Sequence, residues 1–538
     1  MWDRTNKARI AGAAPGQKLL LEQGTIIKDW GGQLPVALIY PNSYYLGMSN
    51  LGVQAIYSLL NRQSGIVCER VFLEQGKAPQ SVESQRPLTD FAVLAFSVSY
   101  EPDYFNVARV LKASGIPLYA SQRNSSHPLV IAGGACITAN PAPLSPYFDA
   151  MCIGEAEPIL PSVLPVLSEG IGGNRDELLK TLASLPGMYV PRYYSGTPVV
   201  RQWAKALDDF PVASAVMTPD TELGDLYLME VERGCAWGCR FCLVCTAFSP
   251  IRFRSLDKLL EQARIGLNYR KRIGLVGPAV SDHPQIGELL SGLRQLGAEL
   301  SFSSLRISSL TPTLWEEIAR CGVKTITLAP EAGSERLRKV IKKGISEADI
   351  LGALNIAAEK GIRQLKLYFM TGLPTETDED TEEIINLALT AKGILDKSGA
   401  RLTINISPFV PKPGTPFQWF HMAPVETLDR RIEHIKNRLA KKGIKLNYEG
   451  PAWSEVQAVL SRGDARIAEV LADMEAWSLP AWRRAVKKFD LDVDFYAHQK
   501  WDTSRELPWS VVDSGMRLER LKGELSKALG EATPMPGT

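Results

Sequence analysis

The stretch Cys235-Ala-Trp-Gly-Cys239-Arg-Phe-Cys242 follows the apolar run Leu226–Val231 and points to both the fold and the chemistry of this chain. Three cysteines separated by three and then two residues can converge on one metal centre. Structural zinc sites close with four protein ligands, and iron–sulfur clusters usually take four thiolates. Three ligands would leave one position open to a small molecule, which indicates a catalytic centre rather than a structural one.

The residues around these cysteines suit such a centre. Gly234 and Gly238 allow tight turns, because glycine tolerates a positive φ angle. Phe241 precedes the third cysteine and could cover one side of a cluster or of a bound ring. The alternative is a zinc knuckle or a redox pair, with Cys245 as a possible fourth thiolate. Zinc sites usually pair two separated Cys-x-x-Cys units, which favours the iron–sulfur interpretation.

The composition is that of an ordinary globular protein. At 538 residues the chain should form two to four domains, and 45% hydrophobic with 22% charged residues is typical of soluble proteins. The net charge of +2 gives no reason to expect nucleic acid or a membrane surface as a partner. No apolar run approaches the ~18 residues that span a bilayer, and Met1–Lys7 lacks the apolar core of a signal peptide. Eight cysteines in so long a chain are no disulfide framework, so we expect a reducing cytoplasm.

Strand and helix signals divide the chain into five segments. Residues 1–33 form a mixed lead segment that we expect to wrap onto a neighbour. Residues 34–195 alternate short apolar strands with helices, which predicts a doubly wound, Rossmann-like α/β domain. Its predicted strands are 34–40, 91–97, 129–134 and 148–154, and Gly133, Gly134 and Gly154 stand at the carboxyl ends of the last two, where such sheets bind ligands. Residues 196–225 are rich in Pro and Asp and read as a linker.

The alternation resumes with a longer period over residues 226–418. Six strands are predicted there, at 226–231, 273–277, 300–307, 325–329, 365–370 and 402–407. Six strand–helix units suggest a partial TIM-like (β/α)6 barrel with its chemistry at the carboxyl ends of the strands. The cysteine run follows the first of these strands, where an active-site loop belongs. Residues 419–538 are predicted to be mainly helical.

The cysteine run resembles the signature of the radical S-adenosylmethionine superfamily. The resemblance implies that Cys235, Cys239 and Cys242 hold a [4Fe-4S] cluster and that the methionine part of S-adenosylmethionine binds the open iron through its amino and carboxylate groups. One electron would then cleave the sulfonium to give a 5′-deoxyadenosyl radical. Cys245 departs from the common pattern, and we expect it to be a spectator or a supporting thiol.

Further cofactor contacts are implied at the ends of the later strands. In the family a Gly-rich turn after the second strand contacts the amino group of the cofactor, and Gly277, Pro278 and Ala279 occupy that place instead of the usual Gly-Gly-Glu. Asp282 and His283 follow, and a helix-capping role is at least as plausible for them as catalysis. The same resemblance assigns cofactor contacts to four residues at the later strand ends: Ser304, Arg306, Glu331 and Gly372. For Glu331, capping of the helix near Ser334 is an equal alternative.

The segment 34–195 resembles the cobalamin-binding domain that precedes many radical S-adenosylmethionine barrels. Gly133, Gly134 and Gly154 fall where that domain has its glycines. The Asp-x-His-x-x-Gly loop that supplies a histidine to cobalt is absent, and no histidine precedes His127. If cobalamin binds, its lower face would meet water, nothing, or a residue such as Tyr44 or Tyr45. The alternative is a degenerate domain kept for packing or substrate contact.

The whole arrangement is similar to a family of cobalamin-binding-domain radical S-adenosylmethionine proteins of undefined substrate. The phrases Phe409–Trp419 and Ser461–Asp464 belong to that resemblance. The leading hypothesis is cobalamin-dependent methyl transfer to an unactivated carbon of a small-molecule or peptide substrate, with a reductant such as flavodoxin or ferredoxin. One alternative is a radical enzyme with a vestigial first domain that performs rearrangement, cyclisation or sulfur insertion; another is a non-enzymatic zinc or redox-sensing protein. The other four cysteines, Cys68, Cys136, Cys152 and Cys321, are spaced irregularly and are expected to be buried rather than to hold a second cluster.

Overall fold

A computed structural model of the chain describes residues 18–74 and 76–532, and the first half of the expected lead segment lies outside these ranges. The chain divides into two compact units. Unit 1 contains residues 1–227, 463–492 and 506–515, and unit 2 contains residues 228–462, 493–505 and 516–538. The C-terminal region, expected as one helical segment, is therefore shared between the two units.

Unit 1 is built on a six-stranded sheet with the order β2-β1-β3-β4-β5-β6. The strands are β1 Leu34–Tyr40, β2 Ile66–Phe72, β3 Val93–Ser97, β4 Leu129–Gly133, β5 Ala150–Cys152 and β6 Met188–Tyr189. The first five run parallel and β6 is antiparallel. Most of these strands are short apolar runs, as expected where both faces of a sheet are covered, whereas β2 carries Glu69 and Arg70. This is the predicted doubly wound architecture.

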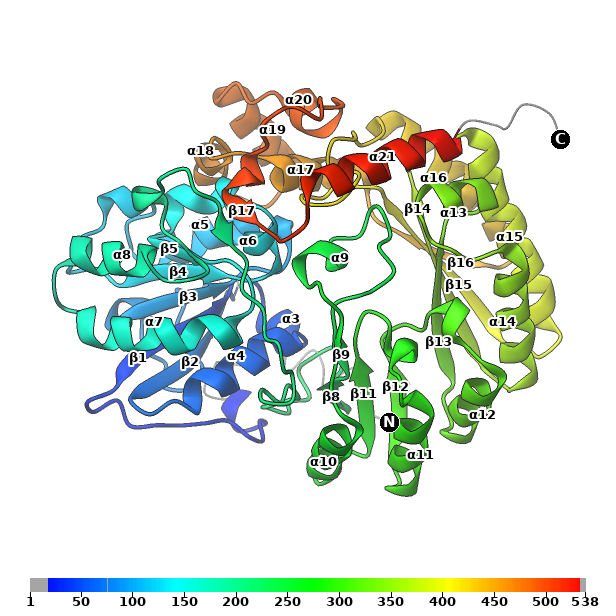
Figure 1. Ribbon diagram of the computed structural model, residues 1–538, viewed down its shortest axis with the longest axis horizontal. Helices are drawn as coiled ribbons and strands as arrows, with labels where there is room; N and C mark the ends of the chain where they lie inside the picture. Colours follow the sequence, from blue (N-terminus) through cyan, green and yellow to red (C-terminus); the bar gives the residue numbers. More distant parts are fainter. Residues whose placement is uncertain (1–17, 75, 533–538) are drawn as a thin grey trace. The chain divides into compact units, whose positions relative to one another are not determined.

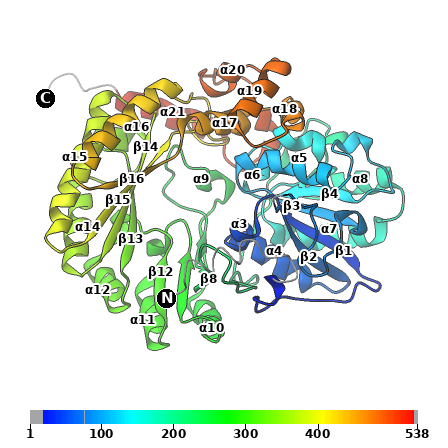
Figure 2. The same cartoon turned by 180° about the vertical axis from the view of Figure 1, so that it is seen from behind.

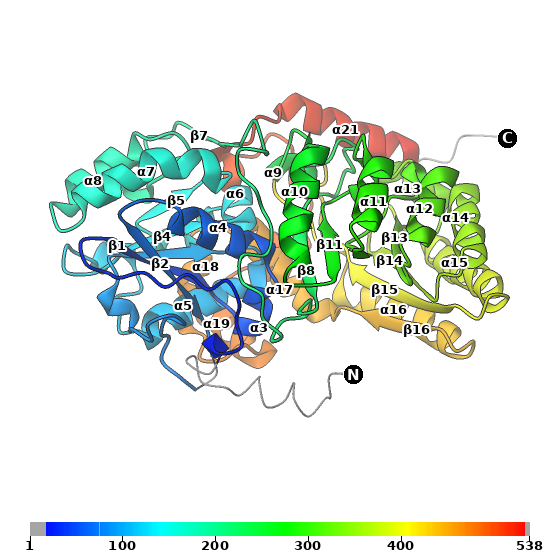
Figure 3. The same ribbon diagram turned by 90° about the horizontal axis from the view of Figure 1, so that it is seen from below.

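Helices cover both faces of this sheet (Figure 3). Helices α4 (Leu51–Asn61), α7 (Ala156–Gly170) and α8 (Arg175–Ala183) pack on one face over alternate residues of the strands, among them Leu38 and Ile131. The other face is covered by α5 (Tyr104–Ala113) together with α18 (Ile467–Asp473) and α19 (Leu479–Lys488), which come from the distant end of the chain. The expected linker also packs within unit 1, where β7 (Val199–Val200) pairs with β17 (Val512–Asp513).

Unit 2 contains the barrel strands in two adjoining sheets, with the orders β12-β11-β8 and β13-β14-β15-β16 (Figure 2). The strands are β8 Leu226–Glu230, β11 Arg272–Val276, β12 Glu299–Phe302, β13 Thr325–Glu331, β14 Gln364–Thr371, β15 Arg401–Pro408 and β16 Lys445–Tyr448. A hydrogen bond of 3.2 Å from the Leu305 amide to the Thr327 carbonyl joins the two sheets just beyond β12. The structure confirms the partial barrel and adds β16 as a seventh strand, which lies beyond the six that were expected.

Helices line the outer side of these strands (Figure 1). They are α10 Leu256–Leu267, α11 Ile286–Gln295, α12 Pro312–Arg320, α14 Glu347–Glu359, α15 Asp378–Asp396 and α16 Val425–Ala440. The third strand is shorter than the expected 300–307: it ends at Phe302, and residues 307–309 form a 3-10 turn. The shortening leaves Ser303–Arg306 as a loop at the mouth of the barrel.

Candidate functional site

The cysteine run forms a closed loop at the end of β8. Strand β9 (Glu232–Arg233) pairs antiparallel with β10 (Arg252–Phe253), so residues 234–251 are held at both ends. Gly234 stands at the neck of the loop with a φ of +86°, and a Cβ there would lie 2.4 Å from the Phe248 carbonyl oxygen. Only glycine fits a backbone of that conformation so close to another backbone. The neck therefore fixes where Cys235 leaves the sheet.

The four thiols of the loop interact with one another. The Cys245 thiol, on α9 (Val244–Ala247), hydrogen-bonds to the sulfurs of Cys235 and Cys242. This contact lowers the pKa of Cys235 to about 6 and lowers that of Cys242, while the pKa of Cys245 is raised. Burial raises the pKa of Cys239, although the positive charges of Lys343 and Arg306 act in the opposite direction.

Within the described residues, no three His, Cys, Asp or Glu side chains already converge as a metal site. The donor set nevertheless fits an iron–sulfur cluster, because such clusters take thiolate ligands. Cys235, Cys239 and Cys242 are close enough for the charges of the first and third to affect the pKa of the second. Cys245 was expected to be a spectator or a supporting thiol, and its contacts with two of the other sulfurs are those of a supporting one.

The turn after β11 packs against a carboxyl group that the sequence analysis overlooked. Glu232 on β9 accepts a hydrogen bond from the Ala279 amide, and a Cβ on Gly277 would lie 2.7 Å from its Cγ. Burial raises the pKa of Glu232 to about 7, and the charges of Asp282 and Cys235 add to the effect. The available signal was its place three residues before Cys235, at the end of the strand that leads into the loop.

Asp282 and His283 have structural partners. The Asp282 carboxylate accepts hydrogen bonds from the indole of Trp237 and from the Ser309 hydroxyl. The His283 imidazole contacts the Arg254 carbonyl at 2.8 Å and the Gln285 amide at 3.1 Å. Neither side chain caps α11, whose N-cap residue is Gln285. Asp282 instead holds the cysteine loop through Trp237.

Arg306 reaches the cysteine loop from the end of β12. Its guanidinium lies 3.5 Å from the centre of the Trp237 ring, and it donates hydrogen bonds to Ser308 Oγ at 2.9 Å and to the Lys343 carbonyl at 3.1 Å. Ser304 is half-buried beside it, but it is the neighbouring Ser303 whose hydroxyl donates to the Gly277 carbonyl, at 3.0 Å. The structure therefore brings Arg306 to the loop, and brings Ser303 rather than Ser304 to the turn.

Glu331 ends β13 at a bulge, with a φ of +68° that is rare for residues other than glycine. Its carboxylate pairs with Lys343 at 3.1 Å, and burial raises its pKa. The N-cap of the following helix, α13 (Glu335–Val340), is Ser334, which excludes the capping alternative for Glu331. Backbone strain at a strand end is a mark of functional sites.

The positions of Gly372 and Phe241 give less indication of a ligand than those of Arg306 and Glu331. Gly372 follows β14 with a φ of +82°, and a Cβ there would lie 2.7 Å from the Leu428 side chain of α16. Its amide also donates to Glu376. The close packing accounts for glycine at this position without a ligand. Phe241 is half-buried within the cysteine loop.

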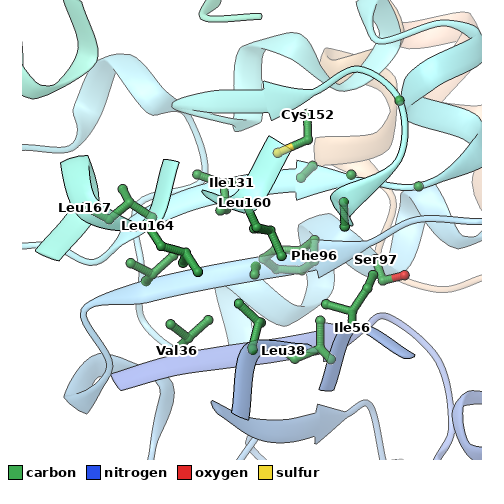
Figure 4. Close-up of a pocket in the computed structure, with 18 residues that line it drawn as sticks. Val36, Leu38, Ile56, Phe96, Ser97, Ile131, Cys152, Leu160, Leu164 and Leu167 are labelled. Atoms are coloured by element: carbon green, nitrogen blue, oxygen red, sulfur yellow. The ribbon is translucent and has the colours of Figure 1, made fainter. Parts of the chain in front are cut away.

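Unit 1 holds a largely apolar cavity of about 130 Å³ between the sheet and α4 and α7 (Figure 4). Gly133, Gly134 and Gly154 all line it, together with side chains such as Leu38, Ile131 and Leu164. Ser97, at the carboxyl end of β3, contributes a hydroxyl to its wall. The three predicted glycines thus meet at one cavity.

Two of these glycines also have a structural reason to be glycine. Gly134 and Gly154 have φ values of +113° and +122°, and a Cβ on either would overlap a neighbouring backbone oxygen. Tyr44 is not placed to face a ligand: it is fully buried and its hydroxyl donates to Glu22. Tyr45 is half-buried.

The remaining cysteines are separated from the loop and from one another. Cys68 lies in β2, Cys136 in α6 (Ala135–Ala139), Cys152 in β5, and Cys321 at the end of α12. Burial raises the pKa of Cys152 to about 12 and that of Cys321 to about 11, so both remain protonated thiols. In the described part of the chain they form no second metal site, and no helix there is long and apolar enough to cross a bilayer.

Both units of the chain contain segments that are similar to known proteins. The family model described as "Radical SAM superfamily" matches residues 229–388, and that described as "Radical SAM proteins, N-terminal" matches residues 52–191. The uncharacterized protein MJ0966 of Methanocaldococcus jannaschii is 34% identical over 447 residues, which cover 81% of this chain and 90% of that protein.

Two further proteins are more distant. The uncharacterized methyltransferase PH0819 of Pyrococcus horikoshii is 25% identical over 299 residues, which cover 53% of this chain and 61% of that protein. The solved structure of the radical S-adenosylmethionine methyltransferase TsrM from Kitasatospora setae, with cobalamin and a [4Fe-4S] cluster bound, is similar with a TM-score of 0.48 and 14% identity. That match covers 73% of this chain and 76% of TsrM.

Proposed function

The chain belongs to the radical S-adenosylmethionine superfamily, and we propose that Cys235, Cys239 and Cys242 hold a [4Fe-4S] cluster in its barrel. The observation that carries this proposal is the closed loop in which these thiols interact, at the carboxyl end of the first barrel strand. When bound, such a cluster supplies the electron that cleaves S-adenosylmethionine to a 5′-deoxyadenosyl radical. The electron would come from a reductant such as flavodoxin or ferredoxin.

The residues around the loop have definable roles in this proposal. Arg306 and Lys343 place positive charge beside the thiolates, which offsets the negative charge of a cluster and favours a carboxylate ligand. Trp237, held by Asp282 and covered by Arg306, keeps the loop in one position. The proposed contacts to S-adenosylmethionine are the turn Gly277–Ala279, Ser304 in the loop after β12, and Glu331 and Gly372 on the opposite sheet. Phe241 would shield the cluster from water.

We further propose that unit 1 binds cobalamin, which would carry a methyl group destined for an unactivated carbon. The support is the cavity bordered by Gly133, Gly134 and Gly154 at the carboxyl ends of parallel strands, where doubly wound sheets bind their ligands. Its apolar walls suit a flat aromatic group more than a charged one. The Ser97 hydroxyl offers a hydrogen bond at the rim.

The second candidate is a radical enzyme in which unit 1 binds no corrinoid. Two observations favour it: no histidine precedes His127, and Tyr44 is buried with its hydroxyl bound to Glu22. In this case hydrogen abstraction would lead to rearrangement, cyclisation or sulfur insertion. Metal analysis after anaerobic purification with added cobalamin separates the candidates. Cobalt bound in a 1:1 ratio to the chain supports methyl transfer, whereas iron without any corrinoid uptake contradicts it.

Two single variants test the cluster. Cys239→Ala should abolish retention of about four irons per chain, while the fold survives, because the residue belongs to a loop rather than to the sheet. Cys245→Ser is the matched control and should retain the iron, because a hydroxyl can still donate to the neighbouring sulfurs. Iron content and visible absorbance after anaerobic reconstitution are the measurements. Bound zinc without iron–sulfur absorbance in the wild type would instead support the zinc alternative.

The substrate can be sought through the hydrogen that it loses. Deuterium from a labelled candidate substrate should appear in 5′-deoxyadenosine if that substrate is the source of the abstracted hydrogen. Small molecules and peptides are the classes to test first.

A further inference from the structure

A buried carboxyl group with one unpartnered oxygen lies beside the cysteine loop. The Glu232 side chain is 1% exposed, and its Oε1 accepts the Ala279 amide hydrogen bond. Among the described residues its Oε2 has no hydrogen-bond partner. Burying a carboxylate without a partner is costly, and proteins normally pair such a group or use it.

The nearby cations are engaged elsewhere. The Arg233 guanidinium donates to both carboxylate oxygens of Glu230, at 2.9 and 3.0 Å, and Arg254 donates to Glu230 as well. Glu230 thus takes two arginines on β8 while Glu232, two residues further on, has no ion pair among the described residues. Two other acids at this end of the barrel have partners: Asp282 has both of its oxygens hydrogen-bonded, and Glu331 pairs with Lys343. The unpartnered oxygen of Glu232 can therefore accept a hydrogen bond from outside the chain.

The position of Glu232 indicates which donor could reach its free oxygen. Glu232 lies three residues before Cys235, and its Cγ packs under the turn at Gly277. A cofactor that binds the open iron through its amino and carboxylate groups would bring its amino group to this end of the loop. An amino group whose lone pair is bound to iron has N–H donors and no acceptor, so it complements a carboxylate oxygen that can only accept.

We infer that Glu232 Oε2 accepts a hydrogen bond from the α-amino group of S-adenosylmethionine. Glu232 would thereby supply, from β9, the carboxylate that the Gly277-Pro278-Ala279 turn lacks. This assignment rests on the proposed function, because it needs S-adenosylmethionine at the barrel mouth. It makes Glu232 a binding residue that selects a ligand with a free α-amino group.

The test compares two ligands on three proteins. Anaerobic titration calorimetry would measure the binding of S-adenosylmethionine and of its deamino analogue to the reconstituted wild type, E232Q and the control E317Q. Glu317 is a buried carboxyl on the outer helix α12, paired with Arg320, so its replacement removes the same charge far from the cysteine loop. Iron content confirms that all three proteins carry the cluster.

We expect E232Q to bind S-adenosylmethionine about tenfold or more weakly than the wild type, as the loss of a hydrogen bond to a charged group implies. E232Q and the wild type should bind the deamino analogue equally, and E317Q should match the wild type with both ligands. Equal loss of both ligands in E232Q, or no loss of either, overturns the inference.

The outcomes also separate the inference from the proposed function. A wild type that carries the cluster but binds no S-adenosylmethionine contradicts the proposed function itself. If E232Q fails to fold, E232D serves in its place, since it keeps the charge but withdraws it by one methylene. E232D should then weaken the binding of S-adenosylmethionine alone, and an unchanged affinity overturns the inference.

Discussion

Gly234 illustrates how a single residue determines the geometry of the cysteine loop. Its positive φ and its contact with the Phe248 carbonyl bring the two ends of the loop together. From the sequence we expected Gly234 to allow a tight turn. The structure shows a second reason for glycine at this position, which is the close approach of the backbone at Phe248. The close contact between Gly234 and Phe248 fixes the start of the site, because Cys235 is the next residue.

Gly234→Ala should therefore lower the free energy of unfolding by more than an ordinary substitution of a turn glycine does. The conformational penalty is about 1–2 kcal/mol, and the overlap with the Phe248 oxygen adds to it. Gly443→Ala is the control, since Gly443 has a φ of +68° with nothing within 4 Å of the added Cβ. We expect a larger fall in melting temperature, and loss of iron after reconstitution, for Gly234→Ala only. Equal effects of the two variants would show that the close approach is unimportant.

Other residues show the limit of inference from pattern. Arg306 and Glu331 were singled out by resemblance and Phe241 by its place beside Cys242. Glu232 belongs to no motif and is identified only by its burial and its missing partner. Sequence spacing does not reveal which of several acids finds an arginine. That choice depends on the direction in which each strand residue points, and Glu230 and Glu232 differ in the cations they meet.

At the scale of elements, the cysteine loop is tied to a helix from the far end of the chain. Arg240 is almost fully buried, and its guanidinium donates to the Val340 carbonyl at 2.8 Å and to Glu524 at 3.2 Å. Glu524 belongs to α21 (Leu518–Ala532), which packs on α13. A buried cation of this kind holds the loop, the end of α13 and α21 in one arrangement.

Arg240→Met should destabilise unit 2 by about 1–3 kcal/mol, because the Lys339 and Val340 carbonyls lose their guanidinium donor. Glu524 would keep its ion pairs with Lys342 and Lys527. It should also speed the loss of iron to a chelator, since the loop would lose its anchor. Arg430→Met is the control: Arg430 and Asp378 form an exposed ion pair, which contributes about 1 kcal/mol or less. Thermal unfolding and the rate of iron release are the measurements. Similar results for both variants would contradict the anchoring role.

The strands that sequence analysis found differ in residue pattern from β2 and β16, which it did not predict. β2 is buried, but Glu69 and Arg70 interrupt its apolar run. β1 is a continuous apolar run with almost every residue buried, and this run predicts a strand from the sequence alone. β16 reads Lys-Leu-Asn-Tyr and is mostly exposed at the edge of its sheet. β16 pairs with β15 through backbone hydrogen bonds. Its sequence has no apolar run from which a strand could be predicted.

At the scale of the whole molecule, each unit is assembled from distant parts of the chain. The Asn140 side chain donates to the Gly463 carbonyl at 2.8 Å, and Phe105 stacks on Trp477 with ring centres 5.6 Å apart. Both contacts lie within unit 1 and join residues more than 300 positions apart. Helices that follow the barrel in sequence thus pack on α5 and complete one side of unit 1.

A fragment of residues 1–227 should therefore be less stable than unit 1 in the full chain. It lacks α18 and α19, so the apolar surface of α5 beneath them would face water. Joining residues 463–492 to the fragment through a flexible linker should restore part of the stability. Thermal unfolding followed by circular dichroism checks both fragments. A fragment 1–227 that melts no lower than the joined form would contradict this view of unit 1.

The sequence by itself determined the class of both domains and the cysteine loop, because strand periodicity and ligand spacing are local properties of the chain. It also placed Gly133, Gly134 and Gly154 at strand ends, where they prove to border one cavity. Only the tertiary structure decided that Cys245 contacts two other thiols, that Glu232 lacks a partner, and that the C-terminal helices are shared between units. The physical reason is that side-chain pairing, burial and long-range packing depend on which surfaces meet in the folded chain. The spacing of residues along the sequence does not determine which surfaces meet.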